Sequence, residues 1–174
     1  MSTPVANTVD VTAARRIAGQ VPDPELPMVT IGDLGILRAV TVDERGRLVV
    51  SLTPTYSGCP AMAEIFADVV GRLRRAGFAG VTVRTVLQPA WSSDWITAGG
   101  ARKLRAAGIA PPARVTRHPA GQPIPLTLGL RRAAQCPRCG STDTTVVSNF
   151  GATSCTALDR CRACLEPFEH VKEI

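Results

Sequence analysis

Two pairs of cysteines near the C-terminus have a spacing that suits the binding of a metal ion. Cys136 and Cys139 form one Cys-x-x-Cys motif, and 21 residues separate it from the next. Cys161 and Cys164 form the second motif. Tetrahedral zinc takes four thiolates, and two short motifs supply them from opposite sides of the ion. The spacing therefore predicts a four-cysteine zinc ribbon, although four thiolates also hold iron, alone or in a cluster.

Cys155 is a fifth cysteine, within the segment that joins these two motifs. It could replace a ligand, add one, or be a half-buried packing thiol, and the packing role is favoured. The joining segment has runs of β-branched residues, which predict the strands of a ribbon. Residues 135–174 carry few large apolar side chains. We therefore expect metal binding to supply much of their folding energy.

The sixth cysteine, Cys59, immediately precedes Pro60, which suits the first position of a predicted helix. The free N–H groups and the dipole at a helix N-terminus stabilise an anion. We therefore expect the Cys59 thiol to have a lowered pKa and to be reactive or metal-binding. The alternative, from position alone, is a small buried residue where the helix begins.

Nucleophilic catalysis by Cys59 would need a general base, and the sequence has no obvious one. His118 and His170 are the only histidines, one in a proline-rich stretch and one near the C-terminus. We expect both to be solvated surface residues. Protease-like or hydrolase-like catalysis by Cys59 is therefore poorly supported.

Three carboxylates early in the chain are further candidates for a site. Asp23 and Glu25 belong to the segment DPELP, and Asp33 belongs to IGDLG. Such carboxylates do acid–base work or bind a hard cation. On spacing alone, the favoured alternative is that Asp23 and Asp33 make capping and turn hydrogen bonds.

Short alternating elements must position these residues. The predicted order is helix, two strands, helix, strand and helix, at residues 10–20, 36–43, 47–53, 59–77, 81–87 and 92–109. Asp10 or Thr12 caps the first helix, and Gly46 marks a hairpin turn between the first two strands. Gly99 and Gly100 predict a break within the last helical segment.

Proline content divides the chain into three parts. Its 174 residues fit a domain of about 100 residues and a small module. We expect an α+β domain at 1–110, a proline-rich linker at 111–134 and the ribbon module at 135–174.

The composition limits the classes of protein to which the chain can belong. Apolar residues make up 45% of the chain, and the formal net charge is +6. A basic balance permits a nucleic-acid or an acidic protein partner and proves neither. No apolar run approaches the roughly 20 residues that span a bilayer, and the first 20 residues lack a signal-peptide pattern. We expect a cytoplasmic protein, whose cysteines bind metal or react rather than form disulfides.

Three stretches together resemble the MIP18 (DUF59) family in order and spacing: DPELPMVTIGDLGIL, VSLTPTYSGCPAM and LQPAWSSDWITAGGARKLRAAGI. The resemblance covers residues from about 12 to 110. The segment CPRCGSTDT…NFGATSCTALDRCRACLEPFEHVK is similar to the PaaD (PaaJ) type of this family. The resemblance implies a compact α+β fold, in which a small mixed sheet packs against helices.

The resemblance also implies a function in the assembly or delivery of iron–sulfur clusters. The family's characteristic cysteine falls on Cys59, and its DPE loop includes Asp23 and Glu25. The PaaD type implies a maturation factor for the iron–sulfur or di-iron centres of the oxygenase that epoxidises phenylacetyl-coenzyme A. Such a factor assists the oxygenase rather than performing its chemistry, so we expect no catalytic residue and a protein that is not an enzyme. Cys59 would then hold a transient cluster, shared across a homodimer because one cysteine alone is a poor holder, and Asp23, Glu25 and Asp33 would tune it.

The implied partners are the oxygenase's catalytic di-iron subunit and its iron–sulfur reductase. An alternative function is a non-catalytic accessory subunit of the oxygenase complex. A third is a zinc-ribbon nucleic-acid binder, since Asp94 is the only acidic residue between Arg72 and Arg132. An acidic protein partner explains this charge equally well, and nucleic acid is the less favoured of the two.

Overall fold

The computed structural model describes residues 9–56, 58–112 and 134–173 of the chain. Their contacts form two compact units, which divide between Ala90 and Trp91. Most of the predicted linker lies outside the described residues, and so does His118. The end of the α+β domain that the sequence places at residue 110 stays a prediction, because it concerns which residues fold independently.

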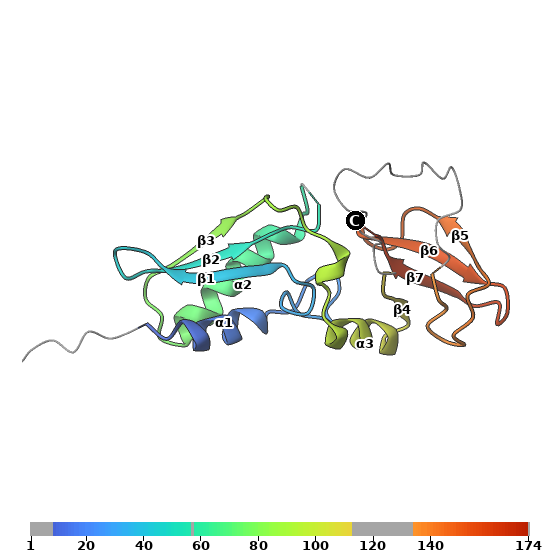
Figure 1. The fold of residues 1–174 in the computed structure, drawn as a ribbon, viewed down its shortest axis with the longest axis horizontal. Helices are drawn as coiled ribbons and strands as arrows, with labels where there is room; N and C mark the ends of the chain where they lie inside the picture. The colour runs from blue at the N-terminus through green and yellow to red at the C-terminus, as the bar shows by residue number, and fades with distance from the viewer. Residues whose placement is uncertain (1–8, 57, 113–133, 174) are drawn as a thin grey trace, which may run out of the picture. The chain divides into compact units, whose positions relative to one another are not determined.

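The first unit is a three-stranded mixed sheet with two helices (Figure 1). Strand β1 (Leu37–Val42) runs antiparallel to β2 (Leu48–Leu52), and β2 runs parallel to β3 (Val81–Thr85). Helix α1 (Val11–Gly19) contacts β1, helix α2 (Ala61–Arg75) contacts β3, and the two helices contact each other. This arrangement confirms the predicted α+β class with a small mixed sheet packed against helices.

The core of the first unit follows from the periods of its elements. Leu48, Val50 and Leu52 alternate along β2 and are almost completely buried. Helix α2 buries residues four positions apart along one face: Ile65, Val69 and Leu73. Each such side chain contributes about 1.5–3 kcal/mol when it leaves water.

Local signals set the ends of these elements. The Asp10 carboxylate accepts a hydrogen bond from the Ala13 N–H at 2.9 Å and caps α1, as predicted. Gly46 has a positive φ of 73° at the tip of the β1–β2 hairpin. Helix α2 begins at Ala61 with Pro60 as its N-cap, so Pro60 lies just outside the helix.

The second unit contains a short 3-10 helix η1 (Ser93–Trp95), helix α3 (Ala98–Ala106) and a four-stranded sheet. The predicted break at Gly99 and Gly100 is wrong, because both glycines lie in the first turn of α3. Thr97 caps this helix, and its Oγ1 accepts a hydrogen bond from the Gly100 N–H at 2.9 Å. The cap stabilises the helix start that the glycines weaken.

The sheet of the second unit has the order β4-β7-β6-β5. Its strands are β4 (Ile109–Ala110), β5 (Thr144–Ser148), β6 (Thr156–Cys161) and β7 (Pro167–Val171). Strands β5, β6 and β7 pair antiparallel, and β4 joins β7 in parallel through Ile109 and Ala110. No helix among the described residues is long and apolar enough to cross a membrane.

Candidate metal centre and cysteine site

The two Cys-x-x-Cys motifs form turns of the same kind, which we call the first and second knuckle. In the first, the Cys136 N–H donates to the Ser141 carbonyl at 2.9 Å. In the second, the Cys161 N–H donates to the Glu166 carbonyl at 3.0 Å. In both, the first cysteine therefore bonds to the residue five positions later, so that the two sulfurs of each knuckle point to one side.

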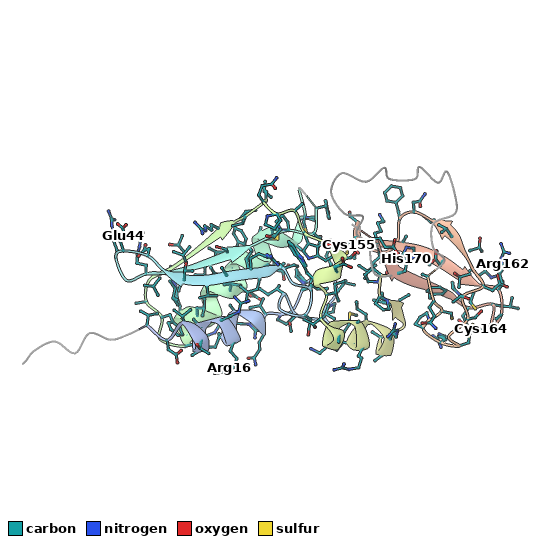
Figure 2. The ribbon with its side chains drawn as sticks, in the orientation of Figure 1. Arg16, Glu44, Cys155, Arg162, Cys164 and His170 are labelled. Carbon is teal, nitrogen blue, oxygen red and sulfur yellow. The ribbon has the colours of Figure 1, made fainter. Side chains whose placement is uncertain are left out.

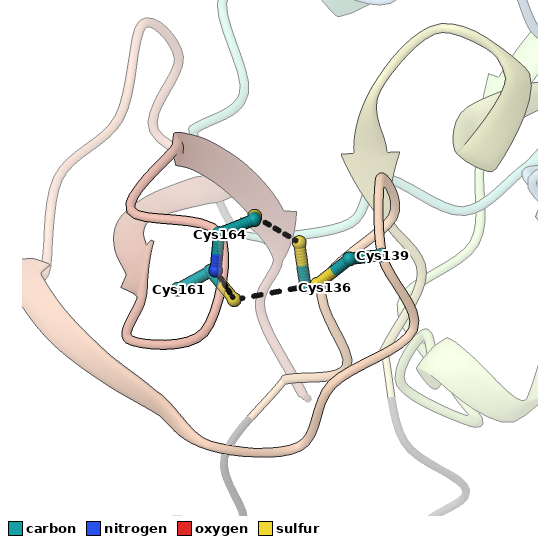
Figure 3. Close-up of side chains that lie close together, drawn as sticks. All are labelled: Cys136, Cys139, Cys161 and Cys164. Carbon is teal, nitrogen blue, oxygen red and sulfur yellow. Dashed lines mark hydrogen bonds between the residues drawn. The ribbon is translucent and has the colours of Figure 1, made fainter.

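The four predicted ligands converge on one point (Figure 3). The Sγ atoms of Cys136 and Cys164 are 3.7 Å apart, and all four sulfurs lie within 4.8 Å of one another. A tetrahedral zinc ion with sulfur bonds of about 2.3 Å separates its ligands by about 3.8 Å. The four sulfurs therefore fit one zinc ion, which Cys136, Cys139, Cys161 and Cys164 would hold.

The electrostatics of the four thiols also favour a cation. The backbone N–H of Cys164 is the largest influence on Cys161 and helps to lower its pKa to about 6. The Glu166 N–H lowers the pKa of Cys164, but burial and the neighbouring thiols raise it to about 12. Because one thiolate opposes the ionisation of the next, a divalent cation is needed to hold all four as thiolates.

Cys155 is not one of these four. It lies at the opposite end of the ribbon from Cys164 (Figure 2). It is 8% exposed, and its Sγ lies 3.0 Å from the Thr153 hydroxyl. This environment fits the packing role.

His170 is not the solvated residue that the sequence predicted. Its side chain is 13% exposed, and Nδ1 lies 2.8 Å from Oδ2 of the buried Asp159. Strand β7 places His170 opposite Ala157 on β6, two residues from Asp159. The sheet therefore uses His170 as a partner for a buried carboxylate.

Cys59 lies in the turn before α2 and is half-buried. Its N–H donates to the Tyr56 carbonyl and its carbonyl accepts from the Met62 N–H, both at 3.3 Å. The Ala61 N–H and the Thr55 hydroxyl donate to the thiol sulfur. These bonds are the anion-stabilising contacts expected at the start of a helix.

The pKa of Cys59 is nevertheless raised above that of a free thiol, which contradicts the predicted lowering. Burial is the largest cause, and the carboxylates of Glu25 and Asp23 add to it. Together they outweigh the Ala61 and Thr55 hydrogen bonds. The structure thus brings the DPELP loop close enough to Cys59 for its charge to act on the thiol.

Asp23 organises this loop from a buried position. The side chain is 6% exposed, and Oδ1 accepts from the N–H groups of Glu25 at 2.9 Å and Leu26 at 2.8 Å. Burial raises the pKa of Asp23, and burial together with the Asp23 charge raises that of Glu25. Asp23 therefore both caps the loop and adds negative charge beside Cys59.

Asp33 closes the next turn. Its Oδ2 accepts from the Thr30 N–H at 3.0 Å and from the Thr30 hydroxyl at 3.1 Å. Asp33 is not among the carboxylates that raise the pKa of Cys59, which are those of Glu25 and Asp23. These contacts give Asp33 the turn-forming role that its spacing favoured.

Two threonines that precede Cys59 in the sequence were not singled out from the sequence. Thr55 bonds to the thiol, as described above. Thr53 follows β2, is 2% exposed, and its Oγ1 has no hydrogen-bond partner among the described residues. A buried hydroxyl without a partner is unfavourable. The sequence signal that could have drawn attention to them is a pair of hydroxyl residues between an apolar strand and the Gly-Cys-Pro turn.

Two family models match separate parts of the chain. One is described as an iron-sulfur cluster assembly protein and matches residues 13–87. The other is described as a PaaD zinc beta ribbon domain and matches residues 120–172. The first range contains Cys59 and the DPELP loop, and the second contains both knuckles.

Proteins from other organisms resemble longer stretches. A protein of Escherichia coli, named as a putative subunit of 1,2-phenylacetyl-CoA epoxidase, is 42% identical over 156 residues, which are 90% of this chain and 88% of the relative. "Fe-S protein maturation auxiliary factor" of Porphyromonas gingivalis is 34% identical over 83 residues, 47% of this chain and 78% of the relative. A crystal structure of a DUF59 domain from Bacillus anthracis is 30% identical, with a TM-score of 0.50, and covers 54% of this chain and 90% of that one.

Proposed function

We propose, on the premise that this chain belongs to the iron–sulfur cluster assembly (MIP18/DUF59) family and carries a PaaD zinc ribbon, that it matures the metal centres of a phenylacetyl-CoA epoxidase. The membership confirms the resemblance expected from DPELP, the Gly-Cys-Pro segment and the paired cysteines. The family is one of assembly and accessory proteins. The observation that carries the proposal is 42% identity, along 90% of the chain, to a relative named as an epoxidase subunit.

Cys59 is the residue that handles the cluster in this proposal, and the cluster is cargo rather than a resident group. Because its pKa is raised, the Cys59 thiol is protonated near neutral pH until iron displaces the proton. The same raised pKa favours reprotonation when the cluster leaves. This balance suits a site that holds a cluster briefly and releases it.

The neighbouring loop shapes that site. Asp23 fixes the backbone of DPELP, Glu25 places a second carboxylate near the thiol, and Asp33 holds the following turn. A single cysteine supplies too few ligands for a cluster. A second copy of the chain would supply another thiolate, so the loaded state is a homodimer.

The ribbon has a different role. Zinc has no redox chemistry, and a closed four-thiolate site leaves no open coordination position for a substrate. When bound, zinc supplies folding energy to the knuckles. The ribbon is therefore free to contact a client, either the di-iron catalytic subunit or the iron–sulfur reductase of the epoxidase.

The test is the iron content of these clients in cells with and without the chain. Each client protein is purified anaerobically from both strains, and its iron is measured per polypeptide. The proposal predicts that one client is iron-poor in the deletion strain and recovers its iron when the wild-type gene is restored. Full iron occupancy in both clients without the chain would contradict it.

A second candidate is a non-catalytic subunit of the assembled epoxidase, which the name of the E. coli relative favours. A subunit of this kind would co-purify with the active complex at a fixed ratio. Its deletion would lower activity while the iron content of the remaining subunits stayed unchanged. The iron measurement therefore separates the two candidates.

A further inference from the structure

The four zinc ligands differ in how far solvent reaches them. The first cysteine of each knuckle is buried, since Cys136 is 2% exposed and Cys161 is 0% exposed. The second cysteine of each knuckle lies nearer to solvent, because Cys164 is partly buried and Cys139 is exposed. A reagent in solution therefore meets the site first at the second cysteines, and above all at Cys139.

The turn of the first knuckle leaves Cys139 more open than its counterpart. The residue after the second cysteine has a positive φ in both knuckles, 76° at Gly140 and 66° at Leu165. Leu165 adds a side chain next to Cys164 in the chain, whereas Gly140 has none. Apart from its chain neighbours, the heavy atom nearest to the place where a Cβ of Gly140 would lie is Gln135 Nε2, 3.9 Å away. In the described part of the chain, the space beside Gly140 is therefore open.

Cys139 also has a second thiol within reach. Its Sγ lies 3.5 Å from the Sγ of the buried Cys161 (Figure 3). The susceptibility of a cysteine to oxidation follows its thiolate character and its exposure, and a neighbouring cysteine then completes a disulfide. When bound, zinc keeps both sulfurs as thiolates. Cys139 thus combines an ionised, accessible sulfur with a partner that an oxidant does not reach directly.

We propose that Cys139 is the site at which peroxides and small electrophiles modify the ribbon, and that its oxidation releases the metal. The Cys139 thiolate attacks one oxygen of hydrogen peroxide, the O–O bond breaks, and a sulfenic acid and a hydroxide ion form. The Cys161 thiolate then attacks the Cys139 sulfur, an S–S bond forms, and a second hydroxide ion leaves. The two sulfurs together lose two electrons, which the peroxide takes up.

The disulfide removes two of the four ligands, so the site loses its zinc and the ribbon loses the folding energy that the metal supplies. This inference goes beyond the proposed function and does not depend on it, because it concerns the ribbon rather than Cys59.

Alkylation of the full-length, zinc-loaded wild-type chain tests the point of entry. N-ethylmaleimide is the probe, because it modifies thiolates without forming a disulfide. Trypsin cleaves after Arg138 and so places Cys136 and Cys139 on different peptides for mass spectrometry. We expect Cys139 to react about tenfold faster or more than Cys136 and Cys161, since exposure governs access. Modification of Cys136, Cys161 or Cys164 ahead of Cys139 overturns the proposal.

Zinc release under hydrogen peroxide tests the redox step. The wild-type chain should release its zinc, and a peptide that contains the Cys139–Cys161 disulfide should appear as it does so. Cys139→His keeps a zinc ligand that forms no sulfenic acid, so its release should be slower by about tenfold or more. Cys155→Ser is the control, because Cys155 is not one of the four ligands, and it should release zinc as wild type does.

The redox step is overturned if the wild-type chain keeps its zinc in peroxide or loses it without this disulfide. It is also overturned by equal release from a zinc-loaded Cys139→His variant and from wild type. The disulfide is measured on the wild-type chain, so the test stands even where the histidine variant does not bind zinc.

Discussion

The Sγ atoms of Cys139 and Cys161 lie 3.5 Å apart, although 22 positions separate the two residues. Each comes from a different knuckle, and the antiparallel pairing of β5 with β6 brings the knuckles together, with Thr144 opposite Cys161. Thiols at this distance resist joint ionisation unless a cation lies between them. The zinc ion is therefore expected to be integral to the second unit.

Replacement of Cys136 by serine should abolish stoichiometric zinc binding and unfold the ribbon. Structural zinc contributes about 10–16 kcal/mol in isolated zinc modules, so the ribbon cannot fold well without it. Metal analysis should give one zinc per wild-type chain and a marked loss in Cys136→Ser. Limited proteolysis should cleave the second unit of the variant while the first unit survives.

Cys155→Ser is the matched control, because Cys155 is buried in the same unit but contacts Thr153 rather than the four sulfurs. It should retain one zinc per chain. Equal zinc loss in both variants would mean that Cys155 is a ligand.

Asp23→Ala should destabilise the first unit. The substitution leaves the N–H groups of Glu25 and Leu26 without their acceptor, and Leu26 is 4% exposed. Loss of such a buried acceptor costs about 1–3 kcal/mol in the free energy of unfolding. Urea denaturation followed by circular dichroism measures the loss.

Asp43→Ala is a close comparison for this change. Asp43 Oδ1 also accepts two backbone N–H groups, from Arg45 at 3.0 Å and Arg47 at 2.9 Å, but in an exposed turn. Water can replace it there, so the loss should be smaller. Similar losses in the free energy of unfolding for the two variants would show that burial of the Asp23 loop does not add to the stability that its hydrogen bonds provide.

The alkylation of Cys59 should depend on pH with a midpoint above that of a free thiol, because burial and the nearby carboxylates raise its pKa. Only the thiolate reacts, so a raised pKa lowers the thiolate fraction and slows the reaction at pH values below it. Glu25→Gln removes a negative charge, which lowers the pKa and speeds alkylation at a fixed pH of about 8. Peptide mass spectrometry of iodoacetamide-treated protein resolves Cys59 from the other cysteines.

Glu64→Gln serves as the control for this profile, since Glu64 lies in the first turn of α2 but does not contribute to the raised pKa of Cys59. Its pH profile should match wild type. A midpoint below that of a free thiol, or no difference between the Glu25 and Glu64 variants, would show that the DPELP carboxylates do not act on Cys59.

Features encoded within a few residues were predictable from the sequence. Asp10 precedes a helical apolar pattern, and it caps α1. The zinc ligands follow from two local motifs, because four thiolates at this spacing have few other uses. The helix cap and the zinc ligands could each be predicted without knowing how distant parts of the chain fold.

Features that depend on distant residues were not predictable. The helix start at Cys59 predicted a lowered pKa, but carboxylates more than 30 positions away and burial by the fold reversed it. Strand β4 is two residues long and exists only because β7 pairs with it. Leu165 carries no local signal for a left-handed conformation, which the second knuckle imposes on it.

In the proposed function Cys59 delivers metal to the epoxidase, and a strain with Cys59→Ser as the only copy of the gene tests this. The change replaces one atom at a half-buried position outside the zinc site, so the variant should fold and keep one zinc. The measurement is the iron content of the anaerobically purified epoxidase subunits. We predict that one of them is as iron-poor with Cys59→Ser as in the deletion strain. Full iron occupancy with a folded, zinc-loaded variant would show that Cys59 does not deliver the metal.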